Sequence, residues 1–493
     1  MKATWLIVGV LVVVGGVGLF LCHKQGAAQT SPYLEPAQSE LLEQLLEAHM
    51  NYFLSDAVVP RSGIPCTAFK VGNRARFGYS NPTEWGYTMQ AWIAAAERGL
   101  VPTAWAVEHL ETAVATIETL QLDPSQTFNG LPYPFYKVVD SEGRDLPVPA
   151  REPDSNVPSG DDALLYASLV IVQGWANVRG HPDLAQAAQD VAGRMDFRPF
   201  LHSQGGNLYL AHTLNATSGV LSASNWDIYA DEGGMVAWVA LLSGSITMEE
   251  FRQVTHAQYR QAARWTADSG DTYVVQEAAW FSAMFPWAVR SLGGFPIQDA
   301  ECPEHVTSSY ARESLIPAAS ACLALGDQLD IAHPAFSDAM SQARNGRGLV
   351  GWIQDWYIPP NLAGRVLRSA PSDVTPHALF VPLNALPEMS DGQRNQWLDE
   401  IADLMNDEAG YYHTTGQYPF GFEVTASPWA DDLTYAGADD GRPVFETLSA
   451  AYTTLSLFNA LQLSEGRPTF TWFARQVPGY EAELVAVLSF LYP

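Results

Sequence analysis

The chain of 493 residues is long enough for two ordinary domains or one large domain. Hydrophobic residues make up 47% of it and include 15 Trp, 20 Tyr and 21 Phe, so a large core is available and a disordered or fibrous protein is excluded. The 54 acidic residues outnumber the 26 Lys and Arg, and the net charge of −28 excludes nucleic acid or an anionic membrane surface as a partner of the folded body, because both bind basic surfaces.

The N-terminus carries an uncharged stretch, residues 3–21, between Lys2 and Lys24, and small residues follow as far as Ala28. This pattern fits an export signal, and the stretch is also long enough to remain as a membrane anchor. Residues 1–28 are therefore expected to be a signal peptide or an N-terminal anchor. The body, residues 29–493, is expected in the periplasm or outside the cell, either released or anchored by residues 3–21.

Six segments begin with polar residues and continue as nearly uncharged helices, which must be buried on almost every side. They span residues 81–99, 159–175, 231–242, 308–326, 375–387 and 444–463. More amphipathic helices precede or separate them, at residues 41–53, 107–120, 183–195, 247–267, 334–344 and 391–405. This alternation predicts one all-α domain, an (α/α)6 toroid of six inner and six outer helices, with long loops and minor β-hairpins near residues 207–212 and 411–417.

The cysteines are Cys22, Cys66, Cys302 and Cys322, and none has the spacing of a metal site. A disulfide between Cys302 and Cys322 is the most local pairing, and burial as small hydrophobic side chains is an equally good interpretation. Acidic pairs at 431–432 and 439–440 could hold calcium, but solvated turns explain them better. We therefore predict no metal and no organic cofactor.

Acidic residues stand at the starts of four predicted inner helices: Glu84, Asp161 with Asp162, Asp231 with Glu232, and Glu446. Any one of them is explained as a helix cap, but several caps meeting in one cleft beside aromatic rings would suit a sugar. Glycoside hydrolysis requires one carboxylic acid and one carboxylate. Asp161 and Glu232 are the first candidates, with Asp231 beside them, and the expected partner is an oligo- or polysaccharide.

Several motifs occur in a fixed order: Tyr79-Ser80-Asn81-Pro82-Thr83, Ser159-x-Asp161-x-Ala163-Leu164-Leu165 and Trp226-x-x-Tyr229-x-Asp231-Glu232-Gly233. In these motifs residues 40–245 resemble the glucoamylase-like family of bacterial proteins, which includes endo-β-1,2-glucanases and regions of cyclic β-1,2-glucan enzymes. The resemblance implies an (α/α)6 fold and hydrolysis of a β-linked glucan by acidic residues in a central cleft. The candidate substrate-binding residues are Glu84, Trp85, Tyr136, Asp162, Trp226, Tyr229, His377, Phe422 and Glu423.

Two other functions stay open. The Glu that the family motif leads us to expect before Ser159 is either replaced by Asn156 or displaced to Glu152 or Asp154. Asp231 stands where the motif leads us to expect the Glu found one residue later. A non-catalytic glycan-binding or envelope-polysaccharide assembly protein is therefore one alternative. A polysaccharide lyase using His377, or His413 with Tyr412, is the other. A lyase acting on uronic acids would need a positive cleft, and so acidic a chain favours neutral sugars.

Overall fold

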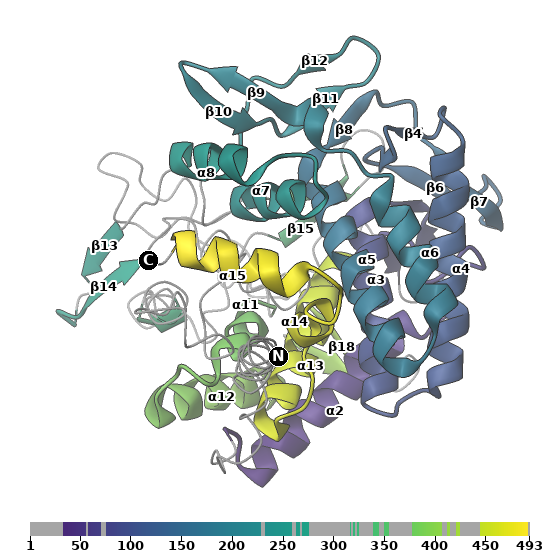
Figure 1. Ribbon diagram of the computed structural model, residues 1–493. Helices are drawn as coiled ribbons and strands as arrows, with labels where there is room; N and C mark the ends of the chain where they lie inside the picture. The colour runs from purple at the N-terminus through teal and green to yellow at the C-terminus, as the bar shows by residue number, and fades with distance from the viewer. Residues whose placement is uncertain are drawn as a thin grey trace, which may run out of the picture.

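In the computed structural model, the described part of the chain is rich in helices and has only small sheets (Figure 1). The structure describes residues 33–55, 58–70, 75–227, 232–258, 263–266, 269–275, 316, 319–320, 323–324, 339–344, 350–353, 377–406, 412–414, 421–423 and 444–491.

The helices follow the order expected from the sequence over most of the described chain. They are α2 (Pro36–Phe53), α3 (Pro82–Glu97), α4 (Thr103–Leu122), α5 (Ser159–Arg179), α6 (Pro182–Gly193), α7 (Glu232–Leu242), α8 (Met248–Ala257), α11 (His377–Phe380), α12 (Asp391–Asn406), α13 (Thr447–Glu465), α14 (Phe470–Ala474) and α15 (Tyr480–Leu491), with 3-10 turns η1 (Arg198–Phe200) and η5 (Val381–Ala385).

The strands are short and pair as small antiparallel sheets. They are β1 (Ala68–Lys70), β2 (Ala75–Phe77), β3 (Tyr79–Ser80), β4 (Thr127–Phe128), β5 (Leu131–Pro132), β6 (Tyr136–Val139), β7 (Asp145–Arg151), β8 (Asn156–Pro158), β9 (Leu201–Gln204), β10 (Asn207–Leu210), β11 (Thr213–Asn215), β12 (Val220–Leu221), β13 (Ala263–Thr266), β14 (Thr272–Val275), β15 (Ala339–Arg344), β16 (Val350–Ile353), β17 (Tyr412–Thr414), β18 (Gly421–Glu423) and β19 (Val444–Glu446). The sheets run β19–β1–β2, β3–β6–β7, β12–β11–β8, β4–β5, β9–β10, β13–β14, β15–β16 and β17–β18.

Helices α3, α5 and α7 are buried along nearly their whole length, as their apolar sequences predict. They pack in the order α13, α3, α5, α7, and α2, α4, α6 and α8 lie against them as a second layer (Figure 1). Glycines allow the closest approaches. A Cβ on Gly86 of α3 would lie 2.4 Å from Ser168 Oγ of α5, and one on Gly174 would lie 1.9 Å from the Phe473 carbonyl oxygen of α14.

The structure corrects two predicted outer helices. Residues 339–344 form β15, because they pair antiparallel with β16 instead of continuing a helix. The helix predicted for residues 247–267 ends at Ala257, and residues 263–266 form β13, paired with β14. The two predicted hairpin segments are confirmed as β10 with β9 and β17 with β18.

Several expectations fall on residues that the structure does not describe. The predicted inner helix at 308–326 is represented only by helical residues at 316, 319–320 and 323–324. Residues 1–28, Cys302 and Cys322 lie outside the described residues. Among the helices that are described, none is both long enough and apolar enough to cross a membrane.

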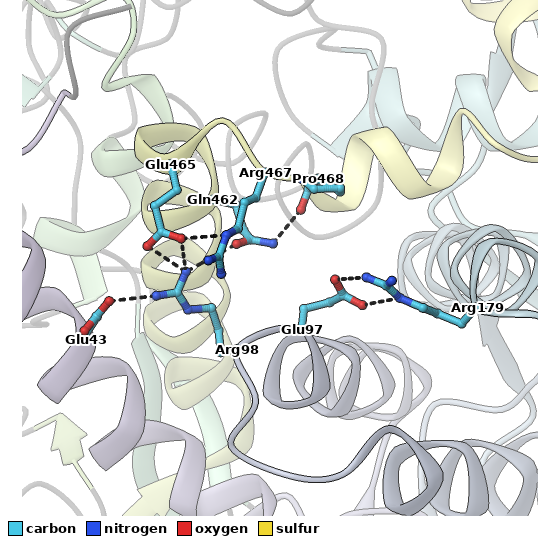
Figure 2. A network of polar contacts seen from close by, with 8 residues as sticks. All are labelled: Glu43, Glu97, Arg98, Arg179, Gln462, Glu465, Arg467 and Pro468. Carbon is cyan, nitrogen blue, oxygen red and sulfur yellow. Dashed lines mark hydrogen bonds and ion pairs between the residues drawn. The ribbon is translucent and has the colours of Figure 1, made fainter. Parts of the chain in front are cut away.

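Ion pairs join the helices at the C-terminal end of α3 (Figure 2). The Arg98 guanidinium lies 2.9 Å from Glu43 of α2 and 2.8 Å from Glu465 of α13, and its side chain is only 9% exposed. The neighbouring Glu97 carboxylate accepts hydrogen bonds from Arg179 and, at 2.8 Å, from Trp175 Nε1 of α5. Two adjacent residues therefore tie α3 to three other helices.

Replacing Arg98 with alanine should lower the free energy of unfolding by about 1–2 kcal/mol, because the largely buried Arg98 side chain loses its packing and its two ion pairs, while the partly exposed carboxylates of Glu43 and Glu465 are hydrated by water instead. The matched control is Arg144→Ala, which removes an exposed arginine paired with Asp140 and Glu142 and should change stability by less than about 1 kcal/mol. Urea denaturation of both variants tests this, and equal losses would contradict it.

Candidate functional site

The start of α3 is fixed by a reciprocal capping box. Asn81 Oδ1 accepts a hydrogen bond from the Glu84 N–H at 3.0 Å, and Glu84 Oε2 accepts one from the Asn81 N–H at 3.0 Å. Pro82 occupies the first turn, where no intrahelical hydrogen bond is lost to it. The sequence Asn81-Pro82-Thr83-Glu84 therefore determines where this helix begins and holds the Glu84 side chain against its own N-terminus.

The Glu84 carboxyl group is fully buried, and its polar contacts are uneven. Thr67 and Ser80 donate their hydroxyl hydrogens to Oε2 at 3.1 Å and 3.2 Å, and Oε1 has no hydrogen-bond partner among the residues that the structure describes. Burial raises the pKa of Glu84 to about 8, against the lowering effect of these hydrogen bonds, and the charge of Asp161 raises it further. Glu84 is therefore mainly protonated at neutral pH.

Thr83 connects α3 to the start of α5. Its hydroxyl donates a 2.6 Å hydrogen bond to Asp161 Oδ1, which holds the half-buried Asp161 carboxyl beside the α3 N-terminus. Burial raises the pKa of Asp161, while the Thr83 hydrogen bond opposes the rise. Glu84 and Asp161, 77 residues apart in sequence, thus come together as the positions of their helix starts predicted.

Asp162 is fully buried next to Asp161, and within the described part of the chain neither of its carboxyl oxygens has a hydrogen-bond partner. Burial, and then the charge of Asp161, raises the pKa of Asp162 well above its usual value. The neutral acid is favoured as a result. The charge of Asp162 also contributes to raising the pKa of the buried Tyr136 hydroxyl, after the larger effect of burial.

Glu232, the first residue of α7, lies directly against the first turn of α5. A Cβ on Gly160 would be 3.0 Å from Glu232 Oε2 and 3.2 Å from Trp226 Cζ2, so the glycine leaves the space that these two side chains fill. Since Asp161 follows Gly160, the structure brings the first candidate pair, Asp161 and Glu232, to adjacent helix starts. The Glu232 side chain is half-buried.

The Trp226 ring lies beside Glu232, since both side chains are within 3.2 Å of the place that a Cβ on Gly160 would take. Trp226 is only 8% exposed, and its Nε1 donates a 2.8 Å hydrogen bond to Ser159 Oγ at the start of α5. The His212 ring packs against it, with ring centres 3.9 Å apart. Burial lowers the pKa of His212, which favours the neutral imidazole. Pairing of Thr213 with Pro158, between β11 and β8, holds His212 at this position.

Trp85 and Tyr136 were predicted to bind substrate, but the structure places both in the core. Trp85 is 1% exposed and Tyr136 is fully buried, and their rings pack edge to face at 5.0 Å. Trp85 Nε1 donates a hydrogen bond to Ser80 Oγ, the same hydroxyl that donates to Glu84. Neither ring offers a face to a ligand in this structure, and the Trp85 indole supports the start of α3.

Tyr87 is a residue that the sequence reasoning missed. It is fully buried on α3, and burial, followed by the electrostatic effects of Tyr452, Glu232 and Asp161, raises its pKa well above the usual value. It follows Thr83 by four residues, so the two share one face of the helix. The four-residue spacing from Thr83 is the sequence signal that could have identified Tyr87 as a neighbour of the candidate site.

Other predicted site residues are not described in the same detail. Tyr229 and Asp231 lie outside the described residues. His377 begins α11, and Phe422 and Glu423 belong to β18, but their side chains lie outside the described part. Within the part that is described, no group of three or more His, Cys, Asp or Glu side chains has an arrangement that could hold a metal ion.

No family model and no curated protein sequence matches this chain. Solved structures do share its fold. An endo-β-1,2-glucanase from Talaromyces funiculosus, in complex with sophorose, has a TM-score of 0.66 at 13% identity over 92% of this chain and 89% of its own. An endo-β-1,2-glucanase from Chitinophaga pinensis, in complex with sophorotriose and glucose, has a TM-score of 0.62 at 12% identity, over 90% of this chain and 97% of its own.

A Bacteroides caccae protein described as a glucoamylase has a TM-score of 0.60 at 14% identity, over 91% of this chain and 98% of its own. The resemblance to the glucoamylase-like family, first seen in short motifs, therefore extends to the fold of nearly the whole chain. At these identities the likeness concerns the fold.

Glu84→Gln should change how stability depends on pH. The pKa of Glu84 rises from 4.5 to about 8 on folding, so between these values the native state keeps a proton that the unfolded state has lost. The free energy of unfolding should fall as pH rises across this window, and glutamine should remove that contribution. We expect the variant to match the wild type at pH 5 and to exceed it by about 1–3 kcal/mol at pH 8.

Urea denaturation from pH 5 to pH 8 measures the difference between the two proteins. Glu47→Gln, on the exposed face of α2, is the control and should follow the wild type at every pH. Identical pH slopes for Glu84→Gln and the wild type would contradict the protonated state of Glu84.

Proposed function

We propose that this chain is a glycoside hydrolase that acts on a neutral, β-linked glucan in a central cleft of an (α/α)6 toroid. The observation that carries the proposal is the meeting of Asp161 and Glu232 at Gly160, on the starts of two neighbouring buried helices. One carboxyl group would protonate the glycosidic oxygen, and the other would activate water or attack the sugar. Burial raises the pKa of Asp161, and a raised pKa is what the acid requires.

The other buried groups would keep these two carboxyl groups in place. Thr83 holds Asp161 by a hydrogen bond, and protonated Glu84 fixes the helix turn that carries Thr83. The neutral acid favoured at Asp162 limits the negative charge next to Asp161. Trp226, braced by Ser159 and His212, would form the side wall for a sugar ring.

The proposed substrate is a β-1,2-glucan. Two of the solved structures that share the fold are endo-β-1,2-glucanases with bound sophorose or sophorotriose, which makes this linkage the first to assay. A net charge of −28 favours a neutral polymer over a uronic acid polymer. We also propose that residues 1–28 export the body or anchor it outside the cytoplasm.

The complete toroid is part of the same proposal. Helices α3, α5, α7 and α13, with α11 continued by η5, would supply five inner segments. The helical residues at 316, 319–320 and 323–324 would belong to the sixth. In such a toroid the inner helices start on one face, which would bring the loops before them around Asp161 and Glu232.

Asp161→Asn and Glu232→Gln should each reduce the rate of glucan hydrolysis by about 10²-fold or more, because each removes a group that transfers a proton or attacks the sugar. The assay measures new reducing ends from linear β-1,2-, β-1,3- and β-1,4-glucans. The control is Asp183→Asn, which changes an exposed carboxylate in the first turn of outer helix α6 and should retain full activity.

Each outcome of this assay separates the candidate functions. Hydrolysis that survives both site substitutions would rule out the assigned pair. Glucan binding without cleavage by the wild type would favour the glycan-binding or envelope-assembly alternative. An unsaturated product that absorbs ultraviolet light would identify a lyase instead.

Gly160→Ala should impair catalysis while the fold is retained. The new Cβ would meet Glu232 Oε2 at 3.0 Å and Trp226 Cζ2 at 3.2 Å, so both side chains must shift, although alanine itself favours a helix. Gly193→Ala is the control, since a Cβ at that α6 position meets nothing within 4 Å. Hydrolysis rates and thermal unfolding are measured for both variants, and equal activity would show that Glu232 does not need this space.

A further inference from the structure

A cavity of about 390 Å³ lies outside the carboxylate cluster. It opens between the end of α2, the turn at residues 59–63 and the first half of α4, and Asp145 at the start of β7 completes its lining. Its size falls within the range of small-molecule sites. Trp92, which packs against one wall, follows Glu84 by eight residues on α3, about 12 Å along the helix.

The aromatic wall of this cavity is rigid before any ligand arrives. The rings of Trp105 and His109 stack with centres 3.6 Å apart, and His109 Nδ1 lies 2.8 Å from the Trp105 carbonyl oxygen. Trp92 packs edge-on against both rings, and its Nε1 donates a 3.0 Å hydrogen bond to the Phe53 carbonyl oxygen. The positions of these rings therefore cost little additional ordering when a ligand binds.

The opposite wall is held just as firmly. Thr116 Oγ1 donates a 2.7 Å hydrogen bond to the Ser62 carbonyl oxygen, which ties the turn to α4. Gly63 has a φ of +74°, and a Cβ there would lie 2.9 Å from the Ala113 nitrogen. The turn can approach α4 this closely only with glycine, so the cavity is preformed on both sides.

Two side chains of opposite charge, Arg61 and Glu108, lie at the rim of the cavity. The exposed side chains of Arg61 and Glu108 line the cavity, and within the described part of the chain neither makes an ion pair or a side-chain hydrogen bond. A simple anion would engage only Arg61, and a simple cation only Glu108 and Asp145. A sugar engages both signs, because each hydroxyl group donates and accepts hydrogen bonds, while its C–H face packs on aromatic rings.

From this arrangement we propose that the cavity lined by Trp105, Arg61 and Glu108 is a second, non-catalytic binding site for a neutral pyranose unit of the glucan. The identity of the glucan rests on the proposed function, and the site itself does not. A polymer held here stays close to the protein between cleavages, which raises its effective concentration at the carboxylates. The benefit applies only to chains long enough to reach both places.

The direct test titrates the disaccharide sophorose, so that each bound molecule fills one site, into the full chain carrying Glu232→Gln, and measures stoichiometry by calorimetry. We expect two sites per chain. Adding Arg61→Ala with Glu108→Gln, two exposed changes outside the packed core, should weaken one of them about tenfold and leave the other unchanged. Unchanged binding in this variant would overturn the proposal.

Trp105→Ala provides a second variant, and Trp472→Ala, an indole that is 39% exposed on α14, is its matched control. Glucan binding should fall with the first and persist with the second. Because Trp105 packs on Trp92, thermal unfolding of Trp105→Ala is measured alongside. Equal binding by the two folded variants would also overturn the proposal.

The kinetic test uses the active protein with Arg61→Ala and Glu108→Gln. KM for long β-1,2-glucan should rise several-fold, with KM for sophorotriose and kcat for both substrates unchanged. A loss of hydrolysis on short and long substrates alike would place the cavity in the catalytic machinery instead. Binding of tetramethylammonium in place of glucan would assign the cavity to a cation. If no glucan is hydrolysed but the rim variant still loses binding, the proposed function fails and this site stands.

Discussion

The close approach of α3 to α5 is the constraint on which the site depends. Gly86 has no side chain, and the space that a Cβ would need is occupied by Ser168 Oγ, so the α5 side chain packs directly against the α3 backbone. One turn before this contact, Thr83 reaches across to Asp161. The capping box of Glu84 fixes where that turn begins. A larger residue at position 86 would separate the helices and lengthen the Thr83 contact, whatever the chemistry of the carboxylates.

The sequence was sufficient to locate the buried helices and the acids at their starts. Segments such as 81–99 and 159–175 are apolar on every side, and only burial stabilises such a helix, so α3 and α5 lie where they were predicted. Glu84, Asp161 and Glu232 were found because a helix start is itself visible in sequence, through Pro, Gly and acidic residues. Their convergence followed from the alternation of buried and amphipathic helices.

The depth at which a side chain is buried and the pairing of strands could not be predicted from short stretches of sequence, because both depend on residues far away in the chain. Trp85 looked like a ring available for a sugar, yet it is buried against Tyr136, because both faces of α3 pack in the core. In the sequence, Tyr87 is one of several aromatic residues in an apolar helix and has no feature that marks it as a site residue. Only the packing of α3 near α7 and α13 brings it to the carboxylates. Residues 339–344 pair with a strand six or more positions away, which a helical period over one short window does not reveal.

The ion pairs of Glu97 and Arg98, shown in Figure 2, lie at the opposite end of α3 from Glu84. One end of the helix therefore holds the neighbouring helices, and the other end holds the candidate site. The C-terminal end clamps α2, α5 and α13 through contacts that do not involve the loops before the buried helices. Those loops can change in length and sequence without disturbing the clamp. Solved structures share this fold over about nine-tenths of the chain at 12–14% identity, so the fold itself tolerates very large changes of sequence.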